Sequence, residues 1–253
     1  MISDSLKSQP PLKELISQLI LTTHAPGRHA ARNAFAHIEN AWKIKDIDPA
    51  MSAFRSITGV EEAATAIFHA LKRQKYNNAQ SLNKNRHFQK AAVYPFFQAI
   101  SRVLSSFNIK AQIICDTNEQ SPKLKIAFSL PFEPFKDRLF YSEPPLHFEL
   151  TMNNEIHNFS DQIEQIVSEN NAKSFCKYSN ELANFRNKIL YASNQGIPTV
   201  KITENNLKKK EQIIVTFLIV YLLISQYDEQ QLFVQQALDS FVKTLNLSDK
   251  ICI

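Results

Sequence analysis

The sequence predicts a mainly α-helical fold, an antiparallel helical bundle that carries a small antiparallel β insertion. Apolar residues recur at helical spacing in both ends of the chain, and strict alternation is confined to its middle. Only three glycines occur among 253 residues, which argues against a turn-rich all-β fold and excludes glycine-rich phosphate loops. We expect a single helical domain over 1–253, with 12–109 and 157–253 forming the bundle and 110–152 forming the insertion.

Helical spacing in the first part of the chain predicts four helices. Asp48 is suited to cap the third helix, and Pro49 suits its first turn. Gly59 lies inside this helix, where glycine is unfavourable by about 1 kcal/mol relative to alanine, so we expect a neighbouring helix to approach closely there. Pro95 predicts that the fourth helix either kinks or begins near that residue. The four helices are expected at 12–23, 28–44, 49–75 and 88–107.

The middle of the chain alternates between apolar and polar residues, which is typical of strands with one buried face. The pattern is clearest at 124–130 and at 146–150, and 113–115 is a shorter apolar run. We therefore expect two or three antiparallel strands, with the proline-rich stretch 131–145 as an irregular connection.

Helical periodicity returns after the insertion and predicts four more helices, at 161–170, 173–192, 205–226 and 229–245. The run from Ile213 to Ile224 is apolar except for Thr216. It is too short to cross a bilayer, which requires about 20 residues. We expect a helix buried on most sides and no association with a membrane.

The chain carries 29 Lys and Arg against 24 Asp and Glu, a formal charge of +5. The stretch 71–90 contains six Lys and Arg residues and His87 but no acid, and 208–210 is a run of three lysines. Both clusters could be solvated helix ends and a loop, or they could contact nucleic acid.

Cys115, Cys176 and Cys252 are widely spaced and form no C-x-x-C pair. This pattern indicates a reducing compartment, so we expect a cytoplasmic protein without a disulfide framework or a cysteine zinc site.

Few residues fit a metal or hydrolase site. His29 and His37 share a helical face with Asn33 but are eight residues apart, about 12 Å along the axis, which is too far to share one metal. The chain has no G-x-S-x-G motif. We expect no metal and no cofactor.

Glu61 and Glu62 lie in the third predicted helix beside the core positions Ile57, Ala64 and Ile67. At least one of the two carboxylates is therefore expected near the bundle interior, where it needs a cationic or donor partner. The alternative is a pair of solvated helix acids.

Arg186, Asn187 and Tyr191 form a second candidate group in the helix predicted at 173–192. Asn187 and Tyr191 are four residues apart and share a face, and Arg186 can reach the same groove at the helix end. Alternatively, Arg186 pairs with a glutamate of the third helix to set the bundle register, with Tyr191 in the core.

An acidic pair in an alanine-rich helix, followed by a helix with Arg-Asn-x-x-x-Tyr-Ala, resembles the HEPN superfamily, most of all its abortive-infection V branch (AbiV). The resemblance covers 30–75 and 173–245, so that 76–160 would be an insertion. It implies an antiparallel helical bundle, often dimeric, with the arginine motif of each copy at the shared interface.

Catalytic members of that superfamily are metal-independent ribonucleases that use Arg-x4-6-His. This chain has Tyr191 and no histidine in the motif, and a tyrosine, with an ordinary pKa of about 10, is a poor general base. The resemblance therefore supports phosphate binding more than RNA cleavage. An imidazole would have to come from elsewhere, from His69 or His87.

Three functions follow from these observations. The first is a cytoplasmic, homodimeric defence or toxin-type protein that binds RNA or a nucleotide phosphate. The second is a non-catalytic module with a structural pair between Arg186 and Glu61 or Glu62, which dimerises or binds a protein through its β insertion. The third is a small-molecule enzyme of an unfamiliar type. Residues expected to bind phosphate in the first are Arg186, Asn187, Tyr191, Lys84, Arg86 and His87.

Overall fold

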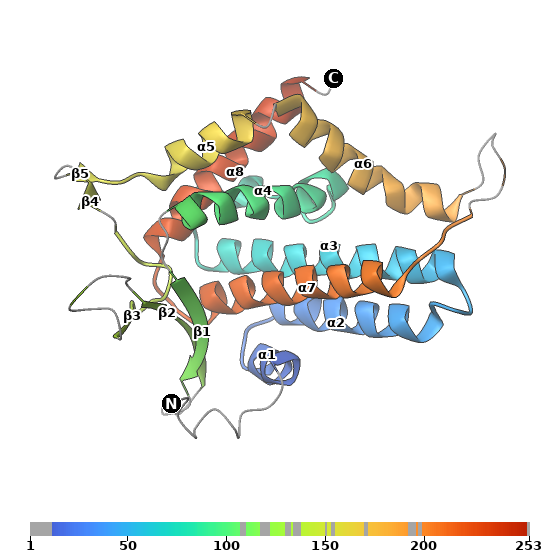
Figure 1. Ribbon diagram of the computed structural model, residues 1–253, viewed down its shortest axis with the longest axis horizontal. Helices are drawn as coiled ribbons and strands as arrows, with labels where there is room; N and C mark the ends of the chain where they lie inside the picture. Colours follow the sequence, from blue (N-terminus) through green and yellow to red (C-terminus); the bar gives the residue numbers. More distant parts are fainter. Residues whose placement is uncertain are drawn as a thin grey trace.

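The computed structural model describes residues 12–106, 110–116, 122–129, 133, 138–149, 151–152, 155–169, 172–191, 196 and 199–251. Within these residues the protein is mainly helical, with eight α-helices, a small three-stranded antiparallel sheet and a two-stranded one formed by the last two strands (Figure 1). The helices are α1 (Leu12–Leu21), α2 (Gly27–Ile44), α3 (Pro49–Arg73), α4 (His87–Ser106), α5 (Phe159–Glu169), α6 (Ala172–Leu190), α7 (Glu204–Ser225) and α8 (Leu232–Ile251). The strands are β1 (Lys110–Asp116), β2 (Lys123–Ser129), β3 (Leu139–Tyr141), β4 (Thr151–Met152) and β5 (Glu155–Ile156).

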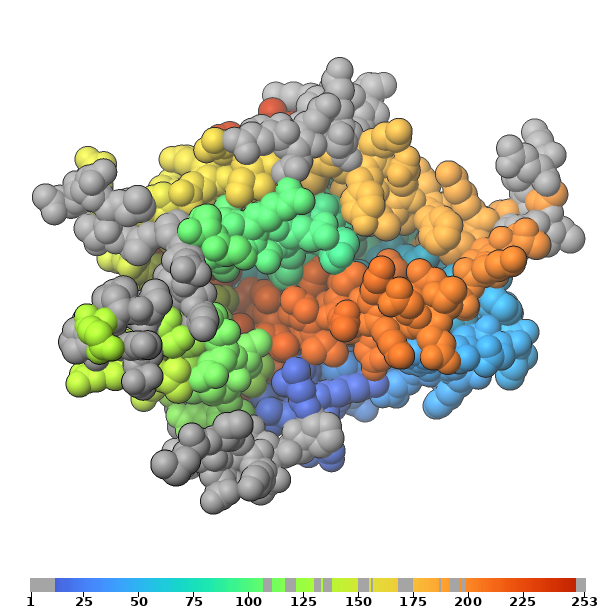
Figure 2. Space-filling model, in the orientation of Figure 1, coloured from blue at the N-terminus to red at the C-terminus, as the bar shows by residue number. Residues whose placement is uncertain are grey.

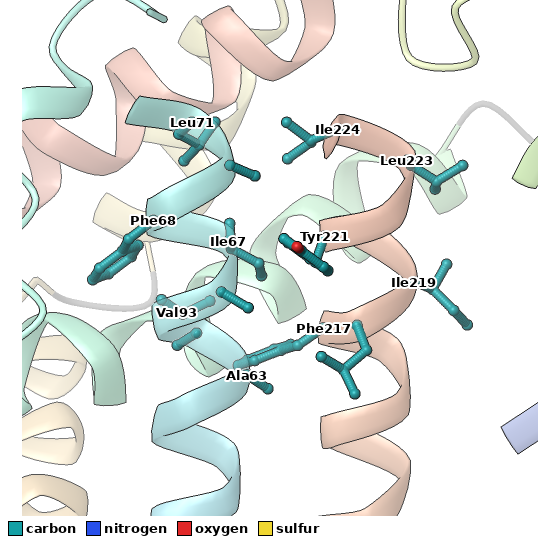
Figure 3. Close-up of a cluster of buried hydrophobic side chains, with 14 of the residues drawn as sticks. Ala63, Ile67, Phe68, Leu71, Val93, Phe217, Ile219, Tyr221, Leu223 and Ile224 are labelled. Atoms are coloured by element: carbon teal, nitrogen blue, oxygen red, sulfur yellow. The ribbon is translucent and has the colours of Figure 1, made fainter. Parts of the chain in front are cut away.

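Helices α2, α3 and α7 form the layer on which the molecule is built (Figure 1). The α2–α3 pair is antiparallel, and the Ser52 hydroxyl donates to the Ala41 carbonyl across it at 2.7 Å. By contrast, α3 and α7 run in the same direction, because Gly59 lies against Ile214 while Leu71 lies level with Ile224 (Figure 3). The predicted antiparallel bundle is thus correct for α2 and α3 and wrong for α3 and α7.

Gly59 is the point of closest approach in this layer, as its place inside a helix predicts. A Cβ atom there would lie 2.9 Å from Ile214 Cδ1 and 3.1 Å from the Ala34 carbonyl oxygen. The start of α3 is also as expected, because the Asp48 carboxylate accepts a hydrogen bond from the Met51 N–H at 2.9 Å. The glycine fixes how closely α3 packs on its neighbours, and the cap fixes where α3 begins.

The core of the layer is apolar and continuous. Figure 3 shows Ala63 and Ile67 of α3 close to Phe217 and Tyr221 of α7, and all four side chains are buried. The predicted buried helix over the apolar run is confirmed. Among the described helices, none is long and apolar enough to cross a membrane.

Helices α4, α5, α6 and α8 form a second layer (Figure 1). Helix α4 contacts both α3 and α6, which also contact each other. It begins at His87, so that Pro95 lies inside the helix rather than at its start. This arrangement brings the first turn of α4 over the middle of α3, where the candidate site is found.

The sheet has the order β1-β2-β3 and is antiparallel, with Ile113 opposite Ile126. The strand predicted at 146–150 is wrong for the described residues 146–149, and the third strand lies at 139–141, in the stretch expected to be irregular. The alternating residues of 146–149 pack onto α8 instead. The Leu146 N–H donates to Gln231 Oε1 at 2.7 Å, and the Phe148 ring stacks on Phe233 at 4.9 Å between centroids.

The described cysteines differ in state. Cys115 is a free thiol, whereas Cys176 is disulfide-bonded. The expectation of reduced cysteines is therefore wrong for Cys176. Cys252 lies outside the described residues.

Candidate functional site

Glu61 is the centre of the candidate site. It lies on the inner face of α3, with 4% of its surface exposed, and three nitrogen-bearing side chains from two other helices surround it. Lys90 Nζ is 3.1 Å and His87 Nδ1 is 2.8 Å from Glu61 Oε2, and Arg186 Nη1 is 3.9 Å from the same atom. One buried carboxylate thus faces two permanent cations and an imidazole. Glu62, the next residue, is half-buried.

His87 connects Glu61 with Arg186. Its Nδ1 is 2.8 and 3.0 Å from the two Glu61 carboxylate oxygens, and its Nε2 is 3.0 Å from Arg186 Nη1. A carboxylate can only accept and a guanidinium can only donate. Nδ1 therefore meets the Glu61 carboxylate as a donor, and Arg186 Nη1, which is 3.0 Å from Nε2 and 3.3 Å from Nδ1, lies against the imidazole ring.

The connection 74–86 sets the position of His87 at the start of α4. Its side chains Tyr76, Ala79 and Leu82 are buried, and the Tyr76 hydroxyl accepts from the Gln231 N–H at 2.8 Å. Burial raises the pKa of Tyr76 to about 12. At the helix itself, Gln89 Oε1 accepts from the Asn83 N–H at 2.6 Å. These bonds hold a polar connection firmly against the core.

Arg186 lies on α6 opposite the middle of α3. Its guanidinium carbon is 4.8 Å from the centroid of the Phe54 ring, a cation–π arrangement, and its Nε is buried without a hydrogen-bond partner. The side chain is 26% exposed. Arg186 is held in place on one side and open to solvent on another.

Glu61, His87, Lys90 and Arg186 line a groove with a volume of about 1010 Å³. Its walls come from α2, α3, the 74–86 connection, α4 and α6. Four cationic side chains face two carboxylates, and three imidazoles lie among them. The charged and imidazole side chains that line the groove are Arg32, Lys84, Lys90, Arg186, Glu61, Glu62, His29, His69 and His87.

Two further histidines of this region have a lowered pKa. For His69, burial lowers the pKa, nearby Lys84 and Lys72 lower it further, and Glu62 opposes them. For His37, burial again is the main cause, followed by Arg55, with Glu62 opposing and Arg186 adding to the decrease. Both shifts favour the neutral imidazole at neutral pH.

The structure brings together most of the site residues expected from the sequence. Lys84 and His87 line the same groove as Arg186, with Glu61 and Glu62. Arg86 is exposed and does not line the groove.

Tyr191 is not part of this group either, and Asn187 cannot be placed with it or apart from it. Tyr191 lies just beyond the end of α6 and is 67% exposed, so it is neither a core residue nor a lining residue of the groove. The side chain of Asn187 lies outside the described side chains.

Sequence reasoning did not single out three contributors: Arg32, Phe54 and the specific pairing of Lys90. Lys90 follows His87 by three residues on a helix, so the two share a face, and that spacing could have linked both to the buried glutamate. Nothing in the local sequence indicates that Phe54 would face Arg186, because the two residues are 132 positions apart, from 54 to 186.

The described residues contain no group of three or more His, Cys, Asp or Glu side chains that could hold a metal ion. The chemistry available is that of fixed cations, a carboxylate-bound imidazole and an open groove. Comparisons with protein families, with curated proteins and with solved structures found no match.

Proposed function

We propose that this protein binds the phosphate groups of RNA in the groove, with Arg186 as the principal phosphate ligand. The observation that carries the proposal is the open side of Arg186 in a groove where four cationic side chains outnumber two carboxylates. A guanidinium presents paired N–H donors that match two phosphate oxygens. An excess of positive charge in a concave site attracts a polyanion.

The contacts of Glu61 favour this function over a purely structural arginine pair. Lys90 and His87 lie within hydrogen-bond distance of the carboxylate, whereas Arg186 Nη1 is 3.9 Å away. Glu61 is thus already partnered by Lys90 and His87, and its ion pair with Arg186 is the longest of the three contacts. A structural pair would instead sequester the guanidinium against the carboxylate.

We extend the proposal to a HEPN-like, AbiV-like protein that acts as a homodimer, in defence or as a toxin; the disulfide bond of Cys176 counts against the cytoplasmic compartment expected from the sequence. The packing of the acidic helix α3 beside the arginine-bearing helix α6 supports this extension, because the resemblance requires these two segments to meet. The shared direction of α3 and α7 departs from a wholly antiparallel bundle.

RNA cleavage is a second candidate, favoured by the position of His87. The motif of α6 has no histidine, but α4 supplies an imidazole 3.0 Å from Arg186 Nη1. Its Nδ1 faces the Glu61 carboxylate at 2.8 Å, which leaves Nε2 as the nitrogen that a substrate can reach. An imidazole held in this way by a carboxylate is suited to accept a proton from a hydroxyl group beside a bound phosphate.

A non-catalytic protein-interaction module is the alternative. Its support comes from β3, whose residues Leu139, Phe140 and Tyr141 are all exposed. In that case the groove would not bind RNA, and Arg186 would only join α6 to α3.

The test is retention and degradation of labelled total RNA by the wild-type protein and by Arg186→Ala. Lys208→Ala is the matched control, because it removes the same charge from an exposed position on α7 outside the groove. We expect RNA retention at low salt by the wild type and Lys208→Ala, and its loss in Arg186→Ala. Equal retention by all three proteins would refute phosphate binding by Arg186.

The same assay tests cleavage. If His87 accepts the proton, His87→Gln loses RNA degradation by a far larger factor than it loses RNA retention, and the wild type degrades RNA in the presence of a metal chelator. Retention without degradation by the wild type would leave binding intact and refute cleavage.

A further inference from the structure

A second groove lies between α4, α7, α8 and the edge of the sheet. Its volume is about 540 Å³, within the range of roughly 300–1,000 Å³ that is typical of small-molecule sites. Figure 2 shows the side chains of α7 set back between α4 and β1 in this region. It is separate from the phosphate groove, and no lining residue is common to the two.

The walls of this groove are apolar. Core side chains form its floor, among them Phe68, Phe96, Leu223 and Phe241, each at most 5% exposed. Protein interiors are close-packed, and unfilled apolar space forfeits dispersion contacts. A groove of this size among core residues is therefore suited to an apolar occupant.

The polar groups of the groove are few and uncharged. None of the described residues that line it is Lys, Arg, His, Asp or Glu. The polar side chains are Ser101, Ser105, Gln112 and Thr216. Among the described lining residues an ionised head group would find no opposite charge with which to form an ion pair.

Two of these hydroxyl groups are set to accept hydrogen bonds. Ser105 Oγ donates its proton to the Ser101 carbonyl at 2.7 Å, and Thr216 Oγ1 donates its proton to the Gln212 carbonyl at 2.9 Å. Each oxygen retains lone pairs for a donor. A ligand that brings a hydroxyl group matches this rim.

We propose that this groove binds a neutral, single-chain amphiphile with a hydroxyl head group, such as a long-chain alcohol. The chain occupies the apolar walls between α4 and α8, and the head group donates to Thr216 or Ser105 at the rim. This inference is independent of the proposed RNA binding.

The test uses three ligands that share one chain and differ only in head group: 1-dodecanol, dodecanoate and dodecylammonium. Each is titrated against the full-length protein preloaded with the neutral fluorescent probe N-phenyl-1-naphthylamine. We expect dodecanol to displace the probe at a concentration at least tenfold lower than either ion. No probe binding, or equal displacement by dodecanoate, would overturn the proposal.

Two variants assign the binding to this groove. Ala111→Phe places a ring in the groove from an exposed position on β1, so we expect folding to persist and dodecanol binding to be lost. Thr216→Val keeps the shape of the side chain and removes the acceptor, and we expect several-fold weaker dodecanol binding with unchanged probe binding.

Gln18→Phe, which adds a ring at an exposed position of α1, is the control. Thermal melts establish that each variant is folded. Dodecanol affinity that is the same in Ala111→Phe as in Gln18→Phe would place the ligand elsewhere and refute the proposed site.

Discussion

Glu61 on α3 and Lys125 on β2 are each buried and each enclosed by groups of opposite charge, but the two clusters balance their charges differently. At Lys125, two carboxylates face one ammonium: Nζ is 2.8 Å from Glu143 and 3.0 Å from Asp116. At Glu61, one carboxylate faces two permanent cations and an imidazole. The first cluster has an excess of negative charge and the second an excess of positive charge.

The surroundings of the two clusters also differ, because the Lys125 cluster is covered and the Glu61 cluster opens into a groove. Lys125 is covered by the Tyr141 ring, whose centroid is 5.3 Å from Nζ, and its hydrogen bonds to Glu143 and Asp116 raise its pKa. The cluster holds β1, β2 and the segment after β3 together. The Glu61 cluster opens into a groove of about 1010 Å³. Cations in excess beside open space, as around Glu61, indicate a binding site. A cation enclosed by carboxylates, as at Lys125, indicates a contact that stabilises the fold.

The largest expected effect is that of Glu61→Gln. The change leaves Lys90 and Arg186 without their counter-charge, and breaking a buried ion pair in this way costs about 3–5 kcal/mol of folding free energy. Urea unfolding of the variant and the wild type measures the difference. We expect inorganic phosphate to restore part of the loss, because an anion in the groove replaces the carboxylate.

The recovery of stability in phosphate distinguishes the Glu61 cluster from the Lys125 cluster. A rise in unfolding midpoint that is no larger in Glu61→Gln than in the wild type would mean that phosphate does not take the place of the Glu61 carboxylate beside these cations.

A smaller loss is expected for Lys125→Met. The substitution keeps much of the apolar stem but leaves Glu143 and Asp116 facing each other, and both carboxylates are partly exposed, so water relieves part of the repulsion. We expect a loss of about 1–3 kcal/mol in the same urea experiment. Phosphate should not restore it. Restoration by phosphate would show that the effect of phosphate is general and unrelated to the groove.

The smallest effect concerns pH. Burial lowers the pKa of His37 from 6.5, so the unfolded chain binds more protons than the folded one as the pH falls below that value. Stability is therefore full above pH 6.5 and decreases as the pH falls toward the folded-state pKa. We expect His37→Gln to lose less stability than the wild type between about pH 7.5 and about pH 5.5. An unchanged pH dependence in chemical unfolding would contradict this account.

Much of the helical part was predictable because its signals are local. The cap at Asp48, the close approach at Gly59 and the buried run of α7 each follow from residues next to one another. The stretch 146–149 shows the limit of such signals. Alternation there predicts a strand, but Leu146 and Phe148 pack on α8 instead, and partners far along the chain cannot be read from local spacing.

Part of the candidate site was also predictable from the sequence. A glutamate at a core position requires a cationic partner, and a later helix offers Arg186, so the two could be linked from the sequence. The place of His87 between them could not, because it depends on how the 74–86 connection folds onto the core. Tyr191 was grouped with Arg186 by motif, but it lies past the end of α6, is exposed, and is not among the residues that line the groove.

The most direct measurement is the salt dependence of binding of a short single-stranded RNA to the wild type, Arg186→Ala and Lys209→Ala. Each phosphate contact contributes about 0.7 to the slope of log affinity against log salt concentration. The account predicts that Arg186→Ala binds more weakly with a slope reduced by about 0.7 or more, while Lys209→Ala, exposed on α7, matches the wild type. The same affinity and the same slope in Arg186→Ala as in Lys209→Ala would contradict it.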